Sequence, residues 1–211
     1  MDMASERKEY QEGFLSAKEL LPDPFDQVKK WINEAMASGE IEPTAACLAT
    51  STAEGKVSSR MVLLKQFSEN GAYFFTHTTS KKGEQLKENP YASLTIYWKS
   101  LERQIILEGP VERLSQEIVD DYFSKRPRKS QLGALASHQG EVLQDRKVLL
   151  NRYQDLEKEY EDKEIPTPPS WGGYALQPVL IEIWQGRPSR LHDHFSYRKS
   201  GSRWILERIS P

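Results

Sequence analysis

The spacing of apolar residues predicts one helix near the N-terminus, followed by many short strands. Five apolar positions recur at helical spacing between the Pro22-Asp23-Pro24 turn and Gly39: Phe25, Val28, Ile32, Ala35 and Met36. The pattern then changes to β-rich runs bounded by turn residues, and we expect strands at Ala45–Ser51, Val57–Phe67, Ala72–His77, Ala92–Trp98 and Gln104–Leu114. The Asn70-Gly71 pair between two of these runs predicts a hairpin.

Helical spacing returns in the middle of the chain, and the tail is again β-rich. We expect helices over Ser80–Glu88, from Ser115 to before Pro127, over Gln131–Ala136 and over Asp145–Tyr160. Strands follow at Tyr174–Trp184, Leu191–Arg198 and Arg203–Arg208. Short strands joined by tight turns favour a mainly β fold, an antiparallel barrel with peripheral helices. A Rossmann fold would need strand–helix alternation and a glycine-rich turn, and neither occurs.

Length and charge narrow the class of protein. The 211 residues suit one large domain or two small ones, and 37% hydrophobic residues is ordinary for a globular chain. We expect a polar arm over residues 1–21 and a single domain over residues 22–211. The net charge of −2 gives no overall basic field for nucleic acid, so any anion site must be local. The polar N-terminus and the lack of a long apolar run favour the cytosol, and an upstream targeting segment stays open.

Two stretches combine cations with strand and helix signals. On a strand over Arg60–Lys65, Arg60 and Lys65 point to opposite faces, so each could hold an anion on its own side. Lys81 and Lys82 stand among hydroxyls at a predicted helix start, where free N–H groups and the helix dipole favour an anion such as phosphate. The alternatives are a barrel strand with charged ends and a capped helix start in solvent.

Tyr122, Arg126 and Ser130 form another candidate phosphate site. Tyr122 and Arg126 share a helix face if the helix reaches that far, and the guanidinium offers forked donors beside two hydroxyls. The alternative is a basic helix end stabilised by its own dipole. Two separate phosphate-sized clusters suggest one phosphorylated cofactor and one phosphorylated substrate.

A fourth cluster lies near the C-terminus. If the chain is extended there, Arg190, His192 and His194 point to one side and could grip a polar aromatic substrate and handle its proton. Two histidines two residues apart also suggest a metal. No cysteine or carboxylate at a familiar spacing supports that alternative, and we expect no metal site.

The chain resembles the pyridoxine 5'-phosphate oxidase family from near its start to its end. The segments that carry the resemblance are Arg60–Lys65, Ser80–Lys82, Leu101–Gln104, Tyr122–Pro127, Ser170–Gly173, Ile183–Gly186 and Arg190–Asp193. The resemblance implies an FMN-binding split β-barrel that works as a homodimer, with flavin at the interface and a C-terminal strand region, about residues 170–211, at that interface. It implies oxidation of pyridoxine or pyridoxamine 5'-phosphate to pyridoxal 5'-phosphate, with dioxygen as acceptor and hydrogen peroxide as product.

The resemblance also implies roles for individual residues. Cofactor contacts are expected from Arg60, Met61, Val62, Leu63, Leu64, Lys65, Phe75, Thr76, Lys81, Lys82, Gln104, Gln139, Gly140, Trp184 and His194. Substrate contacts are expected from Arg7, Lys8, Glu9, Tyr10, Lys65, Tyr122, Arg126, Ser130, Arg190 and His192. Within that set, the arm residues 7–10 would close over the substrate, and Arg190 and His192 would orient its reactive end.

Three positions depart from the family pattern. Lys81 and His194 each stand where the family commonly has Arg, and Gly140 stands where a Ser usually follows Gln139. The first two changes remove forked donors, and the third removes a hydroxyl contact to flavin. We therefore predict weaker FMN retention than in a typical member. Three other functions stay open: a related FMN oxidoreductase with another electron acceptor, a carrier that binds flavin or pyridoxal phosphate, and an interaction domain without cofactor.

Overall fold

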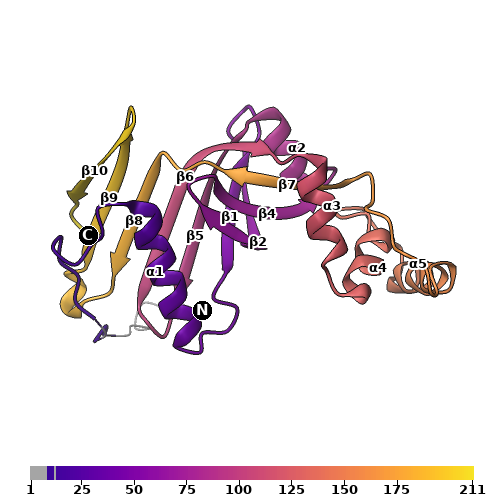
Figure 1. The fold of residues 1–211 in the computed structure, drawn as a ribbon, viewed down its shortest axis with the longest axis horizontal. Coiled ribbons are helices and arrows are strands. Elements are labelled where there is room, and N and C mark those ends of the chain that lie inside the picture. The colour runs from indigo at the N-terminus through magenta and orange to yellow at the C-terminus, as the bar shows by residue number, and fades with distance from the viewer. Residues whose placement is uncertain (1–8, 12) are drawn as a thin grey trace.

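The computed structural model describes residues 9–11 and 13–211. The chain folds around one curled antiparallel sheet (Figure 1). Its strands are β1 (Ala45–Ser51), β2 (Val57–Leu63), β3 (Gln66–Ser68), β4 (Gly71–His77), β5 (Tyr91–Trp98), β6 (Arg103–Arg113), β7 (Trp171–Leu176), β8 (Leu180–Gln185), β9 (Asp193–Ser200) and β10 (Arg203–Arg208). The hydrogen-bonded order is β10-β9-β8-β6-β5-β1-β2, and β4 joins through β7, which pairs with the end of β6. The sheet thus forks at β6 and forms a split β-barrel, which confirms the predicted fold class.

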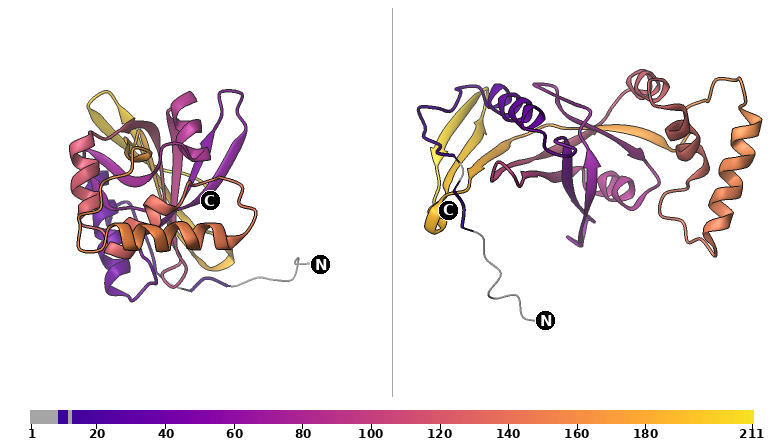
Figure 2. Two further views of the ribbon diagram at one scale, coloured as in Figure 1. Left: turned by 90° about the vertical axis from the view of Figure 1, so that its right-hand side faces the viewer. Right: turned by 90° about the horizontal axis from the view of Figure 1, so that it is seen from below.

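Helices lie around this sheet, most of them near its two ends. They are α1 (Pro24–Ala37), α2 (Lys81–Glu88), α3 (Gln116–Ser124), α4 (Arg128–Ala136), α5 (Arg146–Glu159) and the short 3-10 turn η1 (Pro188–Arg190). In Figure 1, α1 lies near the C-terminal strands, whereas α3, α4 and α5 lie at the opposite end of an elongated molecule. The right-hand view of Figure 2, seen from below, shows the same separation.

Local sequence determines where α1 begins and which face it buries. The carboxylate of Asp23 accepts hydrogen bonds from the backbone N–H groups of Phe25 (2.7 Å) and Asp26 (3.2 Å), and Pro24 occupies the first turn. Its buried apolar stripe is formed by Val28, Trp31, Ile32 and Ala35. Burying such a stripe against the sheet supplies most of the helix's stability.

The apolar side chains form two cores. The larger core joins α1 to the barrel strands, and the smaller one lies under α3 and α4, where it includes Phe123, Leu132 and Trp171. The arm enters the larger core through Leu15 and Leu20, both of which are buried. The described part of the arm is therefore packed onto the barrel.

One predicted strand, Tyr174–Trp184, is divided into β7 and β8. The break falls at Pro178, which has no backbone N–H to give to a strand ladder. The chain stays on the same edge of β6 there, because the N–H groups of Gln177 and Val179 bond the carbonyls of Pro110 and Glu108 (both 2.8 Å). The register with β6 shifts by one residue between Leu176 and Leu180, and a Cβ atom at Gly109 would lie 1.9 Å from the carbonyl oxygen of Gln177. Sequence periodicity does not record this bulge, because it depends on the pairing with β6. Among the described residues, no helix is both long and apolar enough to cross a bilayer.

Candidate functional site

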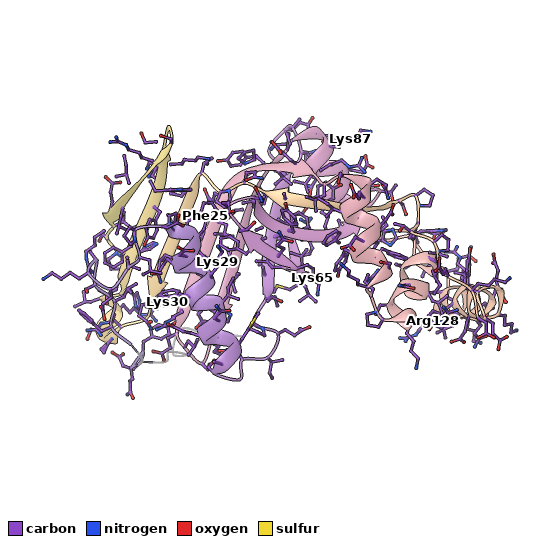
Figure 3. All side chains as sticks on the ribbon, in the orientation of Figure 1. Phe25, Lys29, Lys30, Lys65, Lys87 and Arg128 are labelled. Atoms are coloured by element: carbon purple, nitrogen blue, oxygen red, sulfur yellow. The ribbon has the colours of Figure 1, made fainter. Side chains whose placement is uncertain are left out.

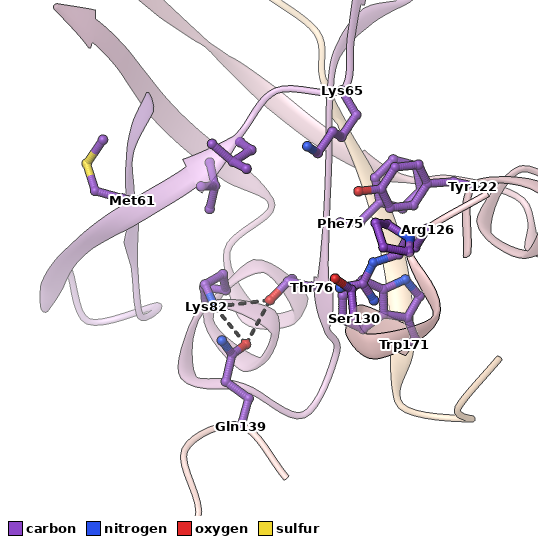
Figure 4. A pocket seen from close by; sticks show the side chains of 13 residues that line it. Met61, Lys65, Phe75, Thr76, Lys82, Tyr122, Arg126, Ser130, Gln139 and Trp171 are labelled. Carbon is purple, nitrogen blue, oxygen red and sulfur yellow. Dashed lines mark hydrogen bonds between the residues drawn. The ribbon is translucent and has the colours of Figure 1, made fainter. Parts of the chain in front are cut away.

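A cavity of about 390 Å³ lies between strands β2 and β4 and helices α3 and α4 (Figure 4). Its lining residues are Met61, Val62, Leu63, Lys65, Phe75, Thr76, Lys82, Tyr122, Arg126, Pro127, Ser130, Gln139 and Trp171. The cation clusters predicted from three separate stretches of sequence thus contribute to one cavity. Lys82 and Arg126 lie on different sides of it in Figure 4.

Lys82 forms a buried cationic corner. Its Nζ donates hydrogen bonds to Oγ1 of Thr76 (3.1 Å) and Oε1 of Gln139 (3.0 Å), and the Thr76 hydroxyl donates to the same Gln139 oxygen (2.9 Å; Figure 4). Burial and, to a smaller extent, the nearby Arg60 cation together lower the pKa of Lys82 to about 8. None of the ion pairs among the described residues involves Lys82. A buried cation without a carboxylate partner is suited to an incoming anion.

Arg60 lies behind this corner and does not line the cavity. Its guanidinium donates to the hydroxyls of Thr50 and Ser58 (both 2.7 Å) and to the carbonyl of Leu48 (3.2 Å). Burial lowers the pKa of Arg60. Its charge therefore acts on Lys82 through space, while its hydrogen bonds join strands β1 and β2.

Three other residues of the expected cofactor set also stand outside the cavity lining. Leu64 is buried in the larger core, and Lys81 is exposed at the first residue of α2. Gly140 is exposed and adopts a φ of +98°, which suits glycine and forms the turn after Gln139.

Lys65 comes from a break in a strand that the sequence predicted as continuous over Val57–Phe67. β2 ends at Leu63, and the N–H of Lys65 bonds the carbonyl of Tyr73 on β4 (2.9 Å) before β3 begins. This switch of partner from β1 to β4 is a long-range pairing. It places Lys65 beside the cavity, and Figure 3 marks it between the sheet and the α3–α5 end.

The predicted shared helix face of Tyr122 and Arg126 is wrong. Helix α3 ends at Ser124, and Arg126 lies in the turn before Pro127, where a following proline disfavours helical backbone. A hydrogen bond from the N–H of Arg126 to the carbonyl of Phe123 (3.2 Å) closes this turn. Both side chains nevertheless line the cavity.

Arg126 forms the second cationic corner. Its Nη1 is buried and has no hydrogen-bond partner among the described residues, and burial lowers its pKa. Tyr122 stacks on Phe75 with ring centroids 3.8 Å apart, and burial raises the pKa of its hydroxyl, so the phenol stays protonated and able to donate. Ser130 lies at the same side of the cavity (Figure 4). An unpaired guanidinium beside two hydroxyls is suited to a phosphate.

Three further residues of the expected cofactor set form a separate group. Gln104 on β6 pairs in register with Trp184 on β8, and Trp184 pairs with His194 on β9, so their side chains share one sheet face. Nε2 of His194 lies 3.3 Å from Oε2 of Glu182. None of these residues lines the cavity of the same chain.

The premise of an extended Arg190–His194 segment is wrong for its first residues. Ser189 and Arg190 adopt φ values of 56° and 60° in η1, and strand β9 begins only at Asp193. His192 still lies with the group of Gln104, Trp184 and His194, which is the second group of site residues, because its ring centroid lies 4.7 Å from that of Trp184. Its Nδ1 accepts a hydrogen bond from the backbone N–H of Arg187 (3.0 Å), and burial lowers its pKa.

Part of the N-terminal arm covers this second group. The Tyr10 ring meets Trp184 and His192 edge-on, with centroids 5.6 Å and 5.4 Å away, and the Glu9 carboxylate accepts a hydrogen bond from the Ser189 N–H (2.5 Å). Arg7 and Lys8, which the sequence assigned to the same segment, lie outside the described residues.

Sequence reasoning assigned no role to two lining residues, Pro127 and Trp171. Trp171 belongs to the Ser170–Gly173 segment, whose two glycines held a usable signal. A Cβ atom at Gly172 would lie 2.5 Å from Cγ2 of Thr78, so the chain passes unusually close to the Thr78 side chain, just after β4. Only a glycine fits this close approach beside Trp171.

The fold and the cavity define a split-barrel protein with two cationic corners in one cavity, and comparison with known proteins specifies the family. A family model described as "Pyridoxamine 5'-phosphate oxidase" matches residues 29–158, and one described as "Pyridoxine 5'-phosphate oxidase C-terminal dimerisation region" matches residues 171–211. The chain therefore belongs to the pyridoxamine 5'-phosphate oxidase family, as the resemblance in its sequence indicated.

Relatives match over nearly the whole chain. The pyridoxine/pyridoxamine 5'-phosphate oxidase of Cyanothece sp. is 48% identical, over 97% of this chain and 96% of its own. That of Mannheimia succiniciproducens is 44% identical over the full length of both. Among solved structures, PhzG from Burkholderia lata 383 in complex with tetrahydrophenazine-1-carboxylic acid matches with a TM-score of 0.90 and 30% identity, covering 97% of this chain and 100% of that one.

Proposed function

We propose that this protein is an FMN-dependent oxidase that converts pyridoxine 5'-phosphate or pyridoxamine 5'-phosphate to pyridoxal 5'-phosphate. One observation carries the proposal: two cationic corners, at Lys82 and Arg126, share a cavity of about 390 Å³. Neither cation has a carboxylate partner within the described part of the chain. Two such corners suit two phosphorylated molecules bound side by side.

The residues at the first corner fit the phosphate of FMN. Lys82 would provide the charge, Thr76 and Gln139 would provide polar contacts, and the N-terminus of α2 would add its dipole. FMN, when bound, would supply the redox chemistry: it would take a hydride from the substrate and pass the two electrons to dioxygen, which would give hydrogen peroxide. The protein's own contribution is to bind, orient and protect the reactants.

The second corner would anchor the substrate phosphate. Arg126 offers unpaired donors, Tyr122 a protonated hydroxyl and Lys65 a further cation, while Ser130 lies beside them. Binding energy from this remote phosphate would hold the reacting carbon in place, which is where much of the rate of a hydride transfer arises.

His192 is suited to orient the reactive end of the substrate. Its Nδ1 accepts the Arg187 N–H, so in the neutral ring the proton sits on Nε2. Burial lowers the pKa of His192, which favours that neutral form near pH 7. The ring could then donate one hydrogen bond from Nε2 to the substrate's alcohol or amine, with Arg190 nearby in sequence as a second polar contact.

A homodimer would bring the two groups of residues together. Within one chain, the cavity and the Trp184–His192 group are separate, and the latter belongs to the segment that matches a dimerisation region. We propose that this group of one copy completes the cavity of the other, with FMN between them.

A second candidate is an FMN oxidoreductase of the same fold with another substrate. The likeness to PhzG favours it, since the ligand named for that structure is a carboxylic acid. The two unpaired cationic corners favour a phosphorylated substrate instead. A carrier that binds flavin or pyridoxal phosphate without turnover is a third possibility.

The decisive assay is aerobic turnover of FMN-reconstituted protein. We expect pyridoxine 5'-phosphate to give pyridoxal 5'-phosphate and hydrogen peroxide in equal amounts. Without dioxygen, the reaction should stop after one turnover per bound flavin. Binding without peroxide would instead identify a carrier. Turnover of a dihydro- or tetrahydrophenazine carboxylate with no turnover of either B6 phosphate would support the second candidate.

A further inference from the structure

We propose that Trp171 is a positioning residue for the substrate phosphate. It holds the Arg126 guanidinium at the cavity and leaves the N–H donors of Arg126 free to bind that phosphate. Cζ of Arg126 lies 4.3 Å from the centroid of the Trp171 ring, and both side chains line the cavity. The inference rests on the proposed function, since it concerns the phosphate of that substrate.

The guanidinium of Arg126 needs support that consumes no hydrogen bonds. It is half-buried, it has no carboxylate partner among the described residues, and its Nη1 has no hydrogen-bond partner there either. A salt bridge would neutralise it, and hydrogen bonds to the protein would occupy its forked donors. The face of an indole attracts the cation through its quadrupole and leaves every N–H in the guanidinium plane available.

Trp171 is itself held firmly. Trp171, on β7, pairs in register with His77 at the end of β4. The His77 ring meets the indole edge-on, with ring centroids 5.1 Å apart. Nδ1 of His77 lies 2.9 Å from Oγ of Ser170, the residue before Trp171. The indole is only 8% exposed, so it cannot turn away from Arg126 without leaving the smaller core.

The charges around His77 are consistent with this arrangement. Burial lowers the pKa of His77, and the cations of Lys82 and Arg126 and the ring of His138 lower it further. A neutral imidazole behind the indole adds no third positive charge between the two corners. The Trp171 face therefore has one cation to stabilise, which is that of Arg126.

A matched pair of substitutions separates stacking from bulk. Trp171→Phe keeps a flat aromatic face, whereas Trp171→Leu keeps comparable apolar volume without one. We expect calorimetry with pyridoxal 5'-phosphate to show binding about two- to thirtyfold weaker in the Leu variant than in the Phe variant, the range typical of a cation–π contact. KM for pyridoxine 5'-phosphate should rise in parallel, with a smaller change in kcat. Inorganic phosphate, used as the simplest probe, should show the same order.

Two controls test whether the effect passes through Arg126. In an Arg126→Ala background, the Phe and Leu variants should bind pyridoxal 5'-phosphate equally, and pyridoxal without phosphate should not distinguish them in any background. Trp31→Phe and Trp31→Leu are remote counterparts, because Arg103 lies 4.6 Å above the Trp31 ring away from the cavity lining. They should differ in thermal stability and leave phosphate affinity unchanged.

The outcomes are separable. Equal phosphate affinity of the two Trp171 variants, or a difference that persists without Arg126, would overturn the positioning role. If the Leu variant does not fold, Trp171→Met, which adapts to irregular apolar space, replaces it with the same expectations. A protein that shows the expected binding differences without oxidising either B6 phosphate would refute the proposed oxidase activity and leave the role of Trp171 intact.

Discussion

Nζ of Lys82 lies 3.0 Å from Oε1 of Gln139, a residue 57 positions further along the chain. The contact joins the start of helix α2 to the loop between α4 and α5, and so connects the barrel to the helical end of the molecule. The first cationic corner therefore depends on a loop as well as on the sheet, and its charge and its geometry can be perturbed separately.

The charge of Lys82 should make FMN binding depend on pH. Its pKa in the ligand-free protein is lowered to about 8, so the ammonium loses its proton as the pH rises through that value, whereas a bound phosphate would favour the charged form. The dissociation constant of FMN, measured by quenching of flavin fluorescence, should therefore be nearly flat around pH 7, where the phosphate is mostly dianionic, and increase by up to about tenfold per pH unit above pH 8. Lys82→Arg should remove the increase below pH 9.5, and a wild-type constant that stays flat to that pH would contradict the role of Lys82.

The geometry of the corner should depend on the ion pair that holds the Gln139 loop. Glu141 accepts hydrogen bonds from Nη1 (2.7 Å) and Nη2 (3.2 Å) of Arg152 on α5. Exposed pairs contribute little, so we expect Glu141→Gln to weaken FMN binding by about two- to fivefold, and high salt to erase the difference. Asp121→Asn removes the exposed ion pair between Asp121, on α3, and Lys125, the residue after it, and is the matched control with no change expected.

Arg126→Ala should mainly raise KM. Losing the charged anchor for the substrate phosphate should increase KM for pyridoxine 5'-phosphate by about ten- to hundredfold, with a smaller loss of kcat. Arg128→Ala is the control, because that side chain donates to the Lys163 carbonyl (3.0 Å) and does not line the cavity. A large loss of kcat at unchanged KM would move Arg126 out of the anchoring role.

His194→Arg should tighten FMN binding. The imidazole at this position lies 3.3 Å from Glu182 and shares a sheet face with Trp184, where the family pattern has a permanent cation. A guanidinium there would pair with the same carboxylate and still offer donors to the cofactor. Equilibrium dialysis against FMN measures the change, and His194→Gln, which brings no charge, should not reproduce it. Equal or weaker binding by the Arg variant would refute the expectation.

Mixed dimers test whether two copies share each site. If each site combines the Arg126 corner of one copy with the His192 group of the other, a hybrid of Arg126→Ala and His192→Ala chains contains one intact site. Random mixing makes half of the dimers hybrids, so activity should recover to about a quarter of the wild-type value. Recovery no greater than the sum of the two parent variants would show that each site lies within one chain.

The local features of the fold could be predicted from the sequence. The side chains of Ser80 and Ser115 cap α2 and α3 as expected, because capping depends on residues within one turn. The alternation along β2 is also as predicted, with Arg60 turned inward and Met61 outward, because a strand has a period of two. Burial of one sheet face then follows from the same alternation.

Contacts between residues that are distant in sequence could not be predicted from the sequence. The change of partner that places Lys65 beside the cavity and the shift of register between β7 and β8 along β6 depend on partners that are distant in sequence. The stacking of Trp171 on Arg126 joins residues 45 positions apart, and no periodicity records such a contact. The resemblance to a family located most of the cavity residues but could not show that Trp184 and His192 lie away from the cavity of their own chain.

Strand β6 fixes the separation between the two parts of the site. Its first half, Arg103–Glu108, pairs with β8 beside Trp184, and its far end, Val111–Arg113, pairs with β7, the strand that begins at Trp171. A strand advances about 3.3 Å per residue and alternates its faces, so inserting one residue near Gly109 would turn one part over relative to the other. Inserting two would restore the facing but lengthen the span by about 6.6 Å. We therefore expect chains with this activity to differ in length in their loops and to keep β6 constant.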